Sequence, residues 1–163
     1  MPKQSPTRSL SFHDSALHIT STSNIQNWRP ELVSNGKYII PGQYKIKSAS
    51  GYYLIHSGNT LQLSSNAENW TLNATNDNYY NITTLIGSTT YYFDVLNGYD
   101  IEGNTVQIQY GTGFIDAQSW KLMLRNDGSV IIVPRVSLSR GIKSTTTGST
   151  LSTSPTAFYL EKV

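Results

Sequence analysis

Short runs of alternating apolar and polar residues follow one another along the chain from Gly42 onward. Such alternation is typical of β-strands that bury one face. Turn residues separate the runs, as in Ser57-Gly58-Asn59 and Asn126-Asp127-Gly128. The pattern predicts twelve strands, at 43–48, 52–56, 60–64, 69–73, 79–85, 90–95, 105–110, 119–125, 129–134, 137–142, 149–153 and 157–162.

The twelve predicted strands fall into three sets of four, and one short phrase recurs in the third strand of each set. It reads GNTLQL from Gly58, GNTVQI from Gly103 and GSTLST from Gly148, so the glycines are 45 residues apart. Its apolar residue recurs at Leu61, Val106 and Leu151. The fourth strands carry a second echo, a large ring at Trp70, Trp120 and Phe158.

A repeat of about 40 residues cannot bury its apolar face alone, so the three copies must pack together. Three four-stranded units closed around a pseudo-threefold axis form a β-trefoil, and closure removes exposed strand edges. A Greek-key sandwich is the main alternative, but it requires no threefold repetition. We therefore expect an all-β chain with a β-trefoil at 37–163, its repeats at about 42–78, 79–128 and 129–163. Residues 1–36 read as a polar, irregular extension anchored by Trp28.

Composition supports this assignment and excludes several functions. Charged residues are only 13% of the chain, against about 25% in typical domains, and Ser, Thr and Asn replace them. The net charge of +2 comes without a basic stripe, so we expect no nucleic-acid partner. The absence of cysteine removes disulfides and thiolate chemistry. Without a long apolar stretch or a signal peptide, we expect no membrane insertion and a cytoplasmic or non-classically secreted protein.

The second repeat carries the most specific motif, between Phe93 and Trp120. It contains Asp94-Val95, then the glycine Gly98, then Gly103 to Ile108, and it closes on Gln118-Ser119-Trp120. This series resembles the ricin B-type lectins, especially cysteine-free fungal lectins and bacterial haemagglutinins. Decayed counterparts of Gln-x-Trp are Glu68-Asn69-Trp70 and Thr156-Ala157-Phe158.

The resemblance implies a non-catalytic glycan-binding protein, with galactose-type or glycoconjugate sugars as partners. Carried over to this chain, Asp94 is the carboxylate that accepts bonds from sugar hydroxyls, Gln107 is the amide beneath the pocket and Gln118 supports it. The ring of Trp120 belongs to the core. The full set of expected carbohydrate-binding residues is Asp94, Gln107, Gln109, Tyr110, Phe114, Asp116 and Gln118.

Two positions depart from the family pattern. Gln109 stands where these lectins usually place an aromatic platform, and Ala117 stands where they often have Asn. Strand alternation turns the next residue, Tyr110, to the opposite face unless a bulge re-aims it. Phe114 or Asp116 in the following loop would substitute. Ile55 takes the place of Asp94 in the first repeat, and Ile142-Lys143 lies nearby in the third, so the pocket is expected once.

Other chemistries have weaker support. The three histidines are scattered, and the acids Asp94, Asp100, Glu102 and Asp116 have no spacing that sets a glycosidase pair or matches an EF-hand. We expect no enzyme, no metal site and no cofactor. A β-trefoil inhibitor of a serine or cysteine protease is the alternative function, and the loop 139–149, with Arg140 and Lys143, would suit a trypsin-like pocket. A single shallow sugar site predicts a homodimer or a larger assembly for avidity.

Overall fold

The computed structural model describes residues 10–13, 16–19, 39–75, 77–111 and 115–163. The chain divides into two units, Met1–Val33 and Ser34–Val163. In the first, β1 (Leu10–His13) and β2 (Ala16–Ile19) form an antiparallel hairpin, where the sequence had predicted irregular structure. Trp28 and Phe114 lie outside the described residues. No helix in the described ranges is long and apolar enough to cross a membrane.

The second unit contains twelve strands, and eleven of them lie at their predicted places. They are β3 (Gly42–Ser48), β4 (Tyr53–Ser57), β5 (Thr60–Ser64), β6 (Trp70–Ala74), β7 (Tyr80–Ile86), β8 (Thr89–Val95), β9 (Thr105–Tyr110), β10 (Trp120–Leu124), β11 (Val130–Pro134), β12 (Gly141–Ser144), β13 (Ser149–Ser152) and β14 (Phe158–Lys162). Two short 3-10 helices, η1 (Leu96–Gly98) and η2 (Asp116–Gln118), interrupt the second repeat.

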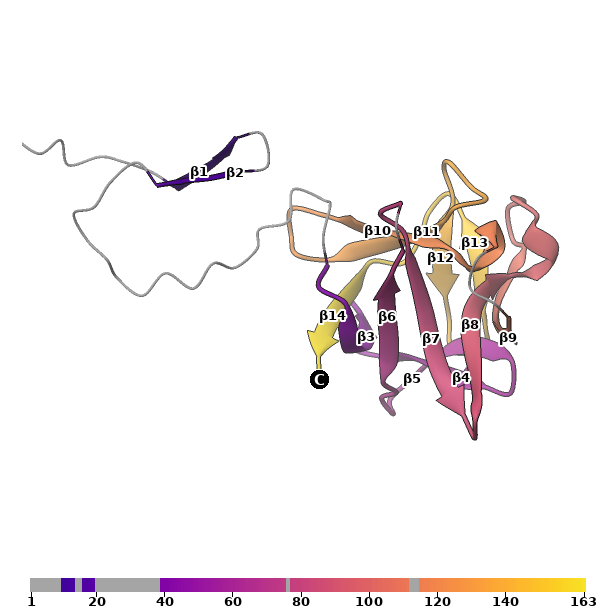
Figure 1. Ribbon diagram of the computed structural model, residues 1–163. Helices are drawn as coiled ribbons and strands as arrows, with labels where there is room; N and C mark the ends of the chain where they lie inside the picture. The colour runs from indigo at the N-terminus through magenta and orange to yellow at the C-terminus, as the bar shows by residue number, and fades with distance from the viewer. Residues whose placement is uncertain (1–9, 14–15, 20–38, 76, 112–114) are drawn as a thin grey trace, which may run out of the picture. The chain divides into compact units, whose positions relative to one another are not determined.

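The first and fourth strands of the three repeats close into a barrel. Antiparallel pairing runs β3–β6–β7–β10–β11–β14 and returns to β3, so that the last strand of the chain lies beside the first strand of the barrel (Figure 1). The remaining strands form three hairpins, β4–β5, β8–β9 and β12–β13. This is the predicted β-trefoil.

The three hairpins meet through the strands that carry the repeated phrase. β9 pairs with β5 at Thr60↔Gln107 and with β13 at Ser149↔Val106. The third side closes where Leu63 N donates to Thr145 O at 2.8 Å. The three hairpins therefore form a cap. Each of these contacts between two hairpins involves β5 or β9, which are strands that follow a repeated glycine.

The core is built from the repeated apolar positions. Leu61, Val106 and Leu151 are fully buried, as are the rings at Trp70, Trp120 and Phe158. Phe93 lies between the two indoles, with ring centroids 4.7 Å from Trp70 and 6.1 Å from Trp120, both edge to face. Edge-to-face contacts match the quadrupoles of aromatic rings, and rings of this size dominate the burial energy of a small core.

One strand lies away from its predicted place. The alternation predicted a strand at 137–142, but β12 runs from Gly141 to Ser144. The preceding residues form a turn instead, because the Ser137 hydroxyl accepts hydrogen bonds from the backbone N–H groups of Ser139 and Arg140. Serine competes for backbone donors in this way, and apolar periodicity does not register that competition.

Candidate functional site

The register of the second hairpin places Asp94 directly opposite Gln107, because β8 and β9 pair without interruption from Tyr91↔Tyr110 to Val95↔Val106. Gln107 Nε2 donates to Asp94 Oδ2 at 3.3 Å. Gln118, from η2, donates through Nε2 to the other oxygen, Asp94 Oδ1, at 3.2 Å. The structure thus brings together the three residues that the sequence placed at the centre of the site.

Burial sets the electrostatics of this cluster. Asp94 keeps only 7% of its surface exposed, and burial raises the pKa of its carboxyl above the ordinary value. The hydrogen bonds from Gln107 and Gln118 favour the carboxylate and act in the opposite direction on the pKa. Each carboxylate oxygen has two lone-pair sites, so one amide bond to each leaves acceptor capacity for a ligand.

The chain after β9 holds Gln118 in place. The side-chain amide of Gln118 packs directly against the backbone of Gly111. A Cβ at Gly111 would lie 2.5 Å from Gln118 Oε1 and 2.6 Å from Nε2, so a residue with a side chain would clash with the amide. Asn81 Nδ2 donates to Gln118 O at 2.8 Å. Two residues on, Trp120 Nε1 donates to Phe93 O at 3.0 Å, which fixes the backbone next to Asp94.

An aromatic side chain that the sequence analysis did not name lies on the same strand as the carboxylate. Tyr92 precedes Asp94 by two residues, so both project from the same face of β8. Across the ladder Tyr92 pairs with Gln109, which is two residues after Gln107. The half-buried tyrosine ring therefore stands beside the position where the family pattern expects an aromatic residue. The two-residue spacing from Asp94 was the available signal.

The other predicted site residues are placed differently. Tyr110 pairs with Tyr91, and the ladder contains no bulge. Tyr110 therefore projects from the same strand face as Val106 and Ile108, which is the other face of the hairpin from Asp94. Its side chain projects beyond the core and is 66% exposed. Asp116 is exposed and forms an ion pair with Arg135, Nε to Oδ1 at 3.2 Å.

The structurally equivalent positions of the first repeat carry different chemistry. Ile55 pairs with Gln62 as Asp94 pairs with Gln107, so the carboxylate is replaced by an aliphatic side chain. Glu68, the counterpart of Gln118, binds His56 instead, accepting from its backbone N at 2.8 Å and contacting Nδ1 at 2.6 Å. A Gln62 amide without an acid opposite cannot form the same cluster.

The third repeat has no room for a side chain at this position. The register shows that Gly141, rather than the neighbouring Ile142-Lys143, is the counterpart of Asp94, since it pairs with Ser152. A Cβ there would lie 2.8 Å from Pro155 Cβ and 2.9 Å from Ile131 Cγ2. The carboxylate–amide cluster accordingly occurs in the second repeat alone among the three equivalent positions.

Two further acids of the second repeat, Asp100 and Glu102, form ion pairs with one arginine. Arg140 Nη1 lies 3.0 Å from Asp100 Oδ1, and its Nε lies 3.2 Å from Glu102 Oε2. Glu102 also accepts from Thr153 N at 2.9 Å. Within the described ranges no three His, Asp or Glu side chains gather so as to hold a metal ion.

No family model and no curated protein matches this sequence. Several solved structures share its fold. ThreeFoil, a designed threefold-symmetric protein, matches with a TM-score of 0.63 at 22% identity, over 75% of this chain and 99% of its own.

Two larger proteins match over a part of their length. A mosquitocidal holotoxin matches with a TM-score of 0.66 at 14% identity, over 77% of this chain and 18% of the toxin. The GlcNAcα1-4Gal releasing endo-β-galactosidase of Clostridium perfringens gives 0.61 at 15% identity, over 74% and 32%. This chain thus spans less than two thirds of either protein, and identities this low establish the fold alone: 39–163 is a β-trefoil.

Proposed function

We propose that this protein is a lectin of the ricin B type, which binds a glycan at the Asp94 site and does not modify it. The observation that carries the proposal is the buried carboxylate of Asp94, held between the amides of Gln107 and Gln118. Two neighbouring sugar hydroxyls match the remaining acceptor positions of such a carboxylate.

Three features of the site favour the binding of a sugar: a charged hydrogen-bond acceptor, an apolar ring beside it and a fixed orientation of the carboxylate. An ionised acceptor makes a stronger bond to a hydroxyl than a neutral one does, and a water-poor surrounding strengthens it further. The ring of Tyr92, on the same face, offers an apolar surface for the C–H side of a sugar ring. The two amides hold the carboxylate in one orientation, so little ordering is required when a ligand binds.

A single small site of this kind binds weakly, so useful avidity requires several copies. We propose a homodimer or a larger assembly, with galactose-type or glycoconjugate sugars as ligands. Non-catalytic recognition fits the ion pairing of Asp100, Glu102 and Asp116, since none of them is free to act beside Asp94 as a second acid.

The protease-inhibitor alternative has no comparable support. Arg140 would have to leave both of its carboxylate partners to enter a protease pocket, and its side chain is only 25% exposed. Lys143 lies within strand β12 rather than at the tip of a protruding loop.

The proposal is tested by glycan-array binding of the unmodified protein beside Asp94→Asn, Gln107→Ala and Gln62→Ala. We expect Asp94→Asn to weaken binding at least tenfold, since hydrogen bonds to a charged acceptor contribute about 1.5–3 kcal/mol. Gln62→Ala is the matched control, because Gln62 holds the same register position in the first repeat. Binding that survives in Asp94→Asn, or that falls equally in Gln62→Ala, would place the site elsewhere.

A further inference from the structure

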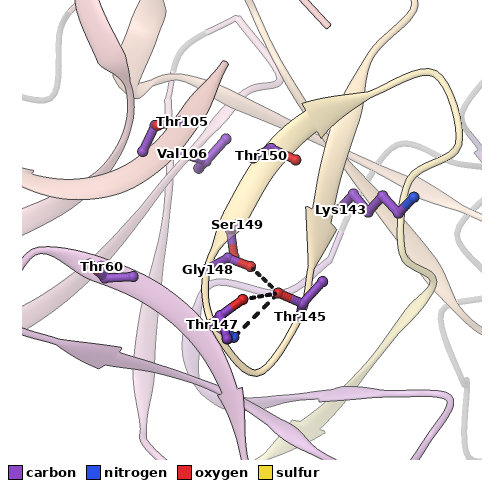
Figure 2. A pocket seen from close by; sticks show the side chains of 9 residues that line it. All are labelled: Thr60, Thr105, Val106, Lys143, Thr145, Thr147, Gly148, Ser149 and Thr150. Atoms are coloured by element: carbon purple, nitrogen blue, oxygen red, sulfur yellow. Dashed lines mark hydrogen bonds between the residues drawn. The ribbon is translucent and has the colours of Figure 1, made fainter. Parts of the chain in front are cut away.

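A cavity of about 440 Å³ opens where the three hairpins of the cap meet, and Asp94, Gln107 and Gln118 do not line it (Figure 2). Each hairpin contributes a threonine to its wall: Thr60 from β5, Thr105 from β9 and Thr150 from β13. These threonines occupy the same place in the three copies of the repeated phrase, two residues after its glycine. The sequence repeat therefore brings three equivalent threonines to one cavity.

The side chains of these threonines differ from that of Thr145 in their hydrogen bonding. Within the described part of the chain, Thr60, Thr105 and Thr150 have no side-chain hydrogen bond. By contrast, Thr145 in the β12–β13 turn is already bonded to Thr147 and to Gly148 O, as the dashed lines in Figure 2 show. A free threonine hydroxyl can donate one hydrogen bond and accept others.

The charge of the lining has one sign. Lys143 is its charged residue, it pairs with Thr150 across the β12–β13 ladder, and no acid lines the cavity. Among the described residues Lys143 has no carboxylate partner, whereas Arg140, on the preceding turn, is bound to Asp100 and Glu102. In Figure 2 the Lys143 side chain extends from β12 and carries its amine away from the other labelled side chains. Its four-carbon stem can turn that amine toward a ligand at the rim.

We propose that this cavity binds a monosaccharide-sized ligand that carries a tetrahedral oxyanion, either a phosphate or a sulfate ester. Hydroxyl and ammonium donors suit the oxygens of such an anion, and no carboxylate is present to repel it. The cavity is much larger than one ion, so its remaining hydroxyls have room to contact the sugar. The cavity adjoins the Asp94 cluster through the pair Thr60↔Gln107, but no residue of that cluster lines it, so the proposal does not rest on the function proposed for the cluster.

The test is a titration followed by two-dimensional ¹H–¹⁵N NMR of the full chain, with glucose 6-phosphate, glucose and inorganic phosphate as separate probes. We expect saturable shifts at the amides of Thr60, Thr105 and Thr150 with glucose 6-phosphate. Affinity should fall at least tenfold with glucose, which lacks the anion, and with inorganic phosphate, which lacks the sugar. The Asp94→Asn variant should bind glucose 6-phosphate as the unmodified protein does.

Three variants assign the site. Lys143→Gln should weaken binding of glucose 6-phosphate at least fivefold, and Thr105→Val should weaken it by a smaller factor while keeping the volume of the side chain. Lys121→Gln is the matched control, since Lys121 is an exposed lysine on β10, outside the cavity lining. An unchanged affinity in Lys143→Gln, or the absence of saturable shifts at the three threonines, overturns the proposal. Equal binding of glucose and glucose 6-phosphate overturns its anionic part, and equal binding of inorganic phosphate overturns its sugar part.

Discussion

Asp94 and Gln107 occupy directly opposed positions on β8 and β9, and Gln107 Nε2 lies 3.3 Å from Asp94 Oδ2. The same opposed pair is Ile55 and Gln62 in the first repeat and Gly141 and Ser152 in the third. A threefold backbone thus presents one pair position three times, and the side chains make it a carboxylate–amide pair only once. The predictions below depend on that difference.

Tyr92→Ala should weaken glycan binding about tenfold, because the ring next to Asp94 would no longer cover the apolar side of a bound sugar. Tyr110→Ala is the matched control, since Tyr110 is a tyrosine of the same hairpin on the opposite face and is mostly exposed. Calorimetric titration of both variants with the best ligand from the array measures the effect. A larger loss in Tyr110→Ala would show that the ring of Tyr110 is the platform.

Gly111→Ala should displace the side chain of Gln118, because the added methyl would lie within 2.6 Å of its amide atoms. Asp94 would then lose one of its two amide donors, and we expect glycan affinity to fall several-fold with about 1–3 kcal/mol lost in the free energy of unfolding. Gly148→Ala is the control, since its nearest contact would be an ordinary 4.0 Å to Thr60. Urea unfolding and glycan titration of both variants measure the two effects, and unchanged glycan binding in Gly111→Ala would contradict the supporting role of Gln118.

The raised pKa of Asp94 makes both stability and binding depend on pH. Between the ordinary value of 3.8 and the raised value, the folded protein holds a proton on Asp94 that the unfolded chain has released. The contribution of Asp94 to stability is therefore fully present below pH 3.8 and is lost as the pH rises through its folded pKa. Glycan binding changes in the opposite direction, because it needs the carboxylate and should fall as the pH drops through that pKa.

Comparison with Asp94→Asn isolates this effect from other acids. The pKa of Asp77 is lowered, chiefly by a hydrogen bond from Thr75, and that of Asp127 is lowered, chiefly by Ser129, so these groups change stability in the reverse sense. Urea unfolding from pH 3 to pH 7 measures the free energy of unfolding of the unmodified protein and of Asp94→Asn. The stability of the unmodified protein relative to Asp94→Asn should decrease as the pH rises above 3.8. A constant difference would mean that Asp94 titrates alike in the folded and unfolded states.

Trp120→Ala should cost roughly 3–5 kcal/mol of unfolding free energy, because the indole is fully buried against Phe93 and donates to its carbonyl. Trp120→Phe keeps most of the ring and loses the N–H donor, so we expect a smaller cost of about 1–3 kcal/mol from the unpaired buried carbonyl. Denaturant unfolding of the two variants gives the order. A Trp120→Ala protein as stable as the unmodified one would show that the ring is not part of the core.

The apolar pattern predicted the core of the fold correctly but missed two local features. The spacing of Leu61, Val106 and Leu151 predicted three units that bury their apolar faces together, and all three side chains are fully buried. The shifted position of β12 was missed because a serine that competes for backbone donors leaves no trace in apolar periodicity. The pairing of β1 with β2 was missed because its strands are only four residues long, which is too short for a clear periodic signal.

The sequence by itself determined the threefold architecture, because burial of apolar surface is non-directional and follows from the order of residue types along the strands. It also singled out Asp94 as the acid of the candidate site, through the motif of the second repeat. Only the tertiary structure decided which side chains meet. The register put Tyr92 beside Gln109, turned Tyr110 to the opposite face and left no space at Gly141, and chain closure brought three threonines 45 residues apart into one cavity. Hydrogen bonds and sugar contacts act over a few ångströms, so they depend on strand pairing and packing that no single segment contains.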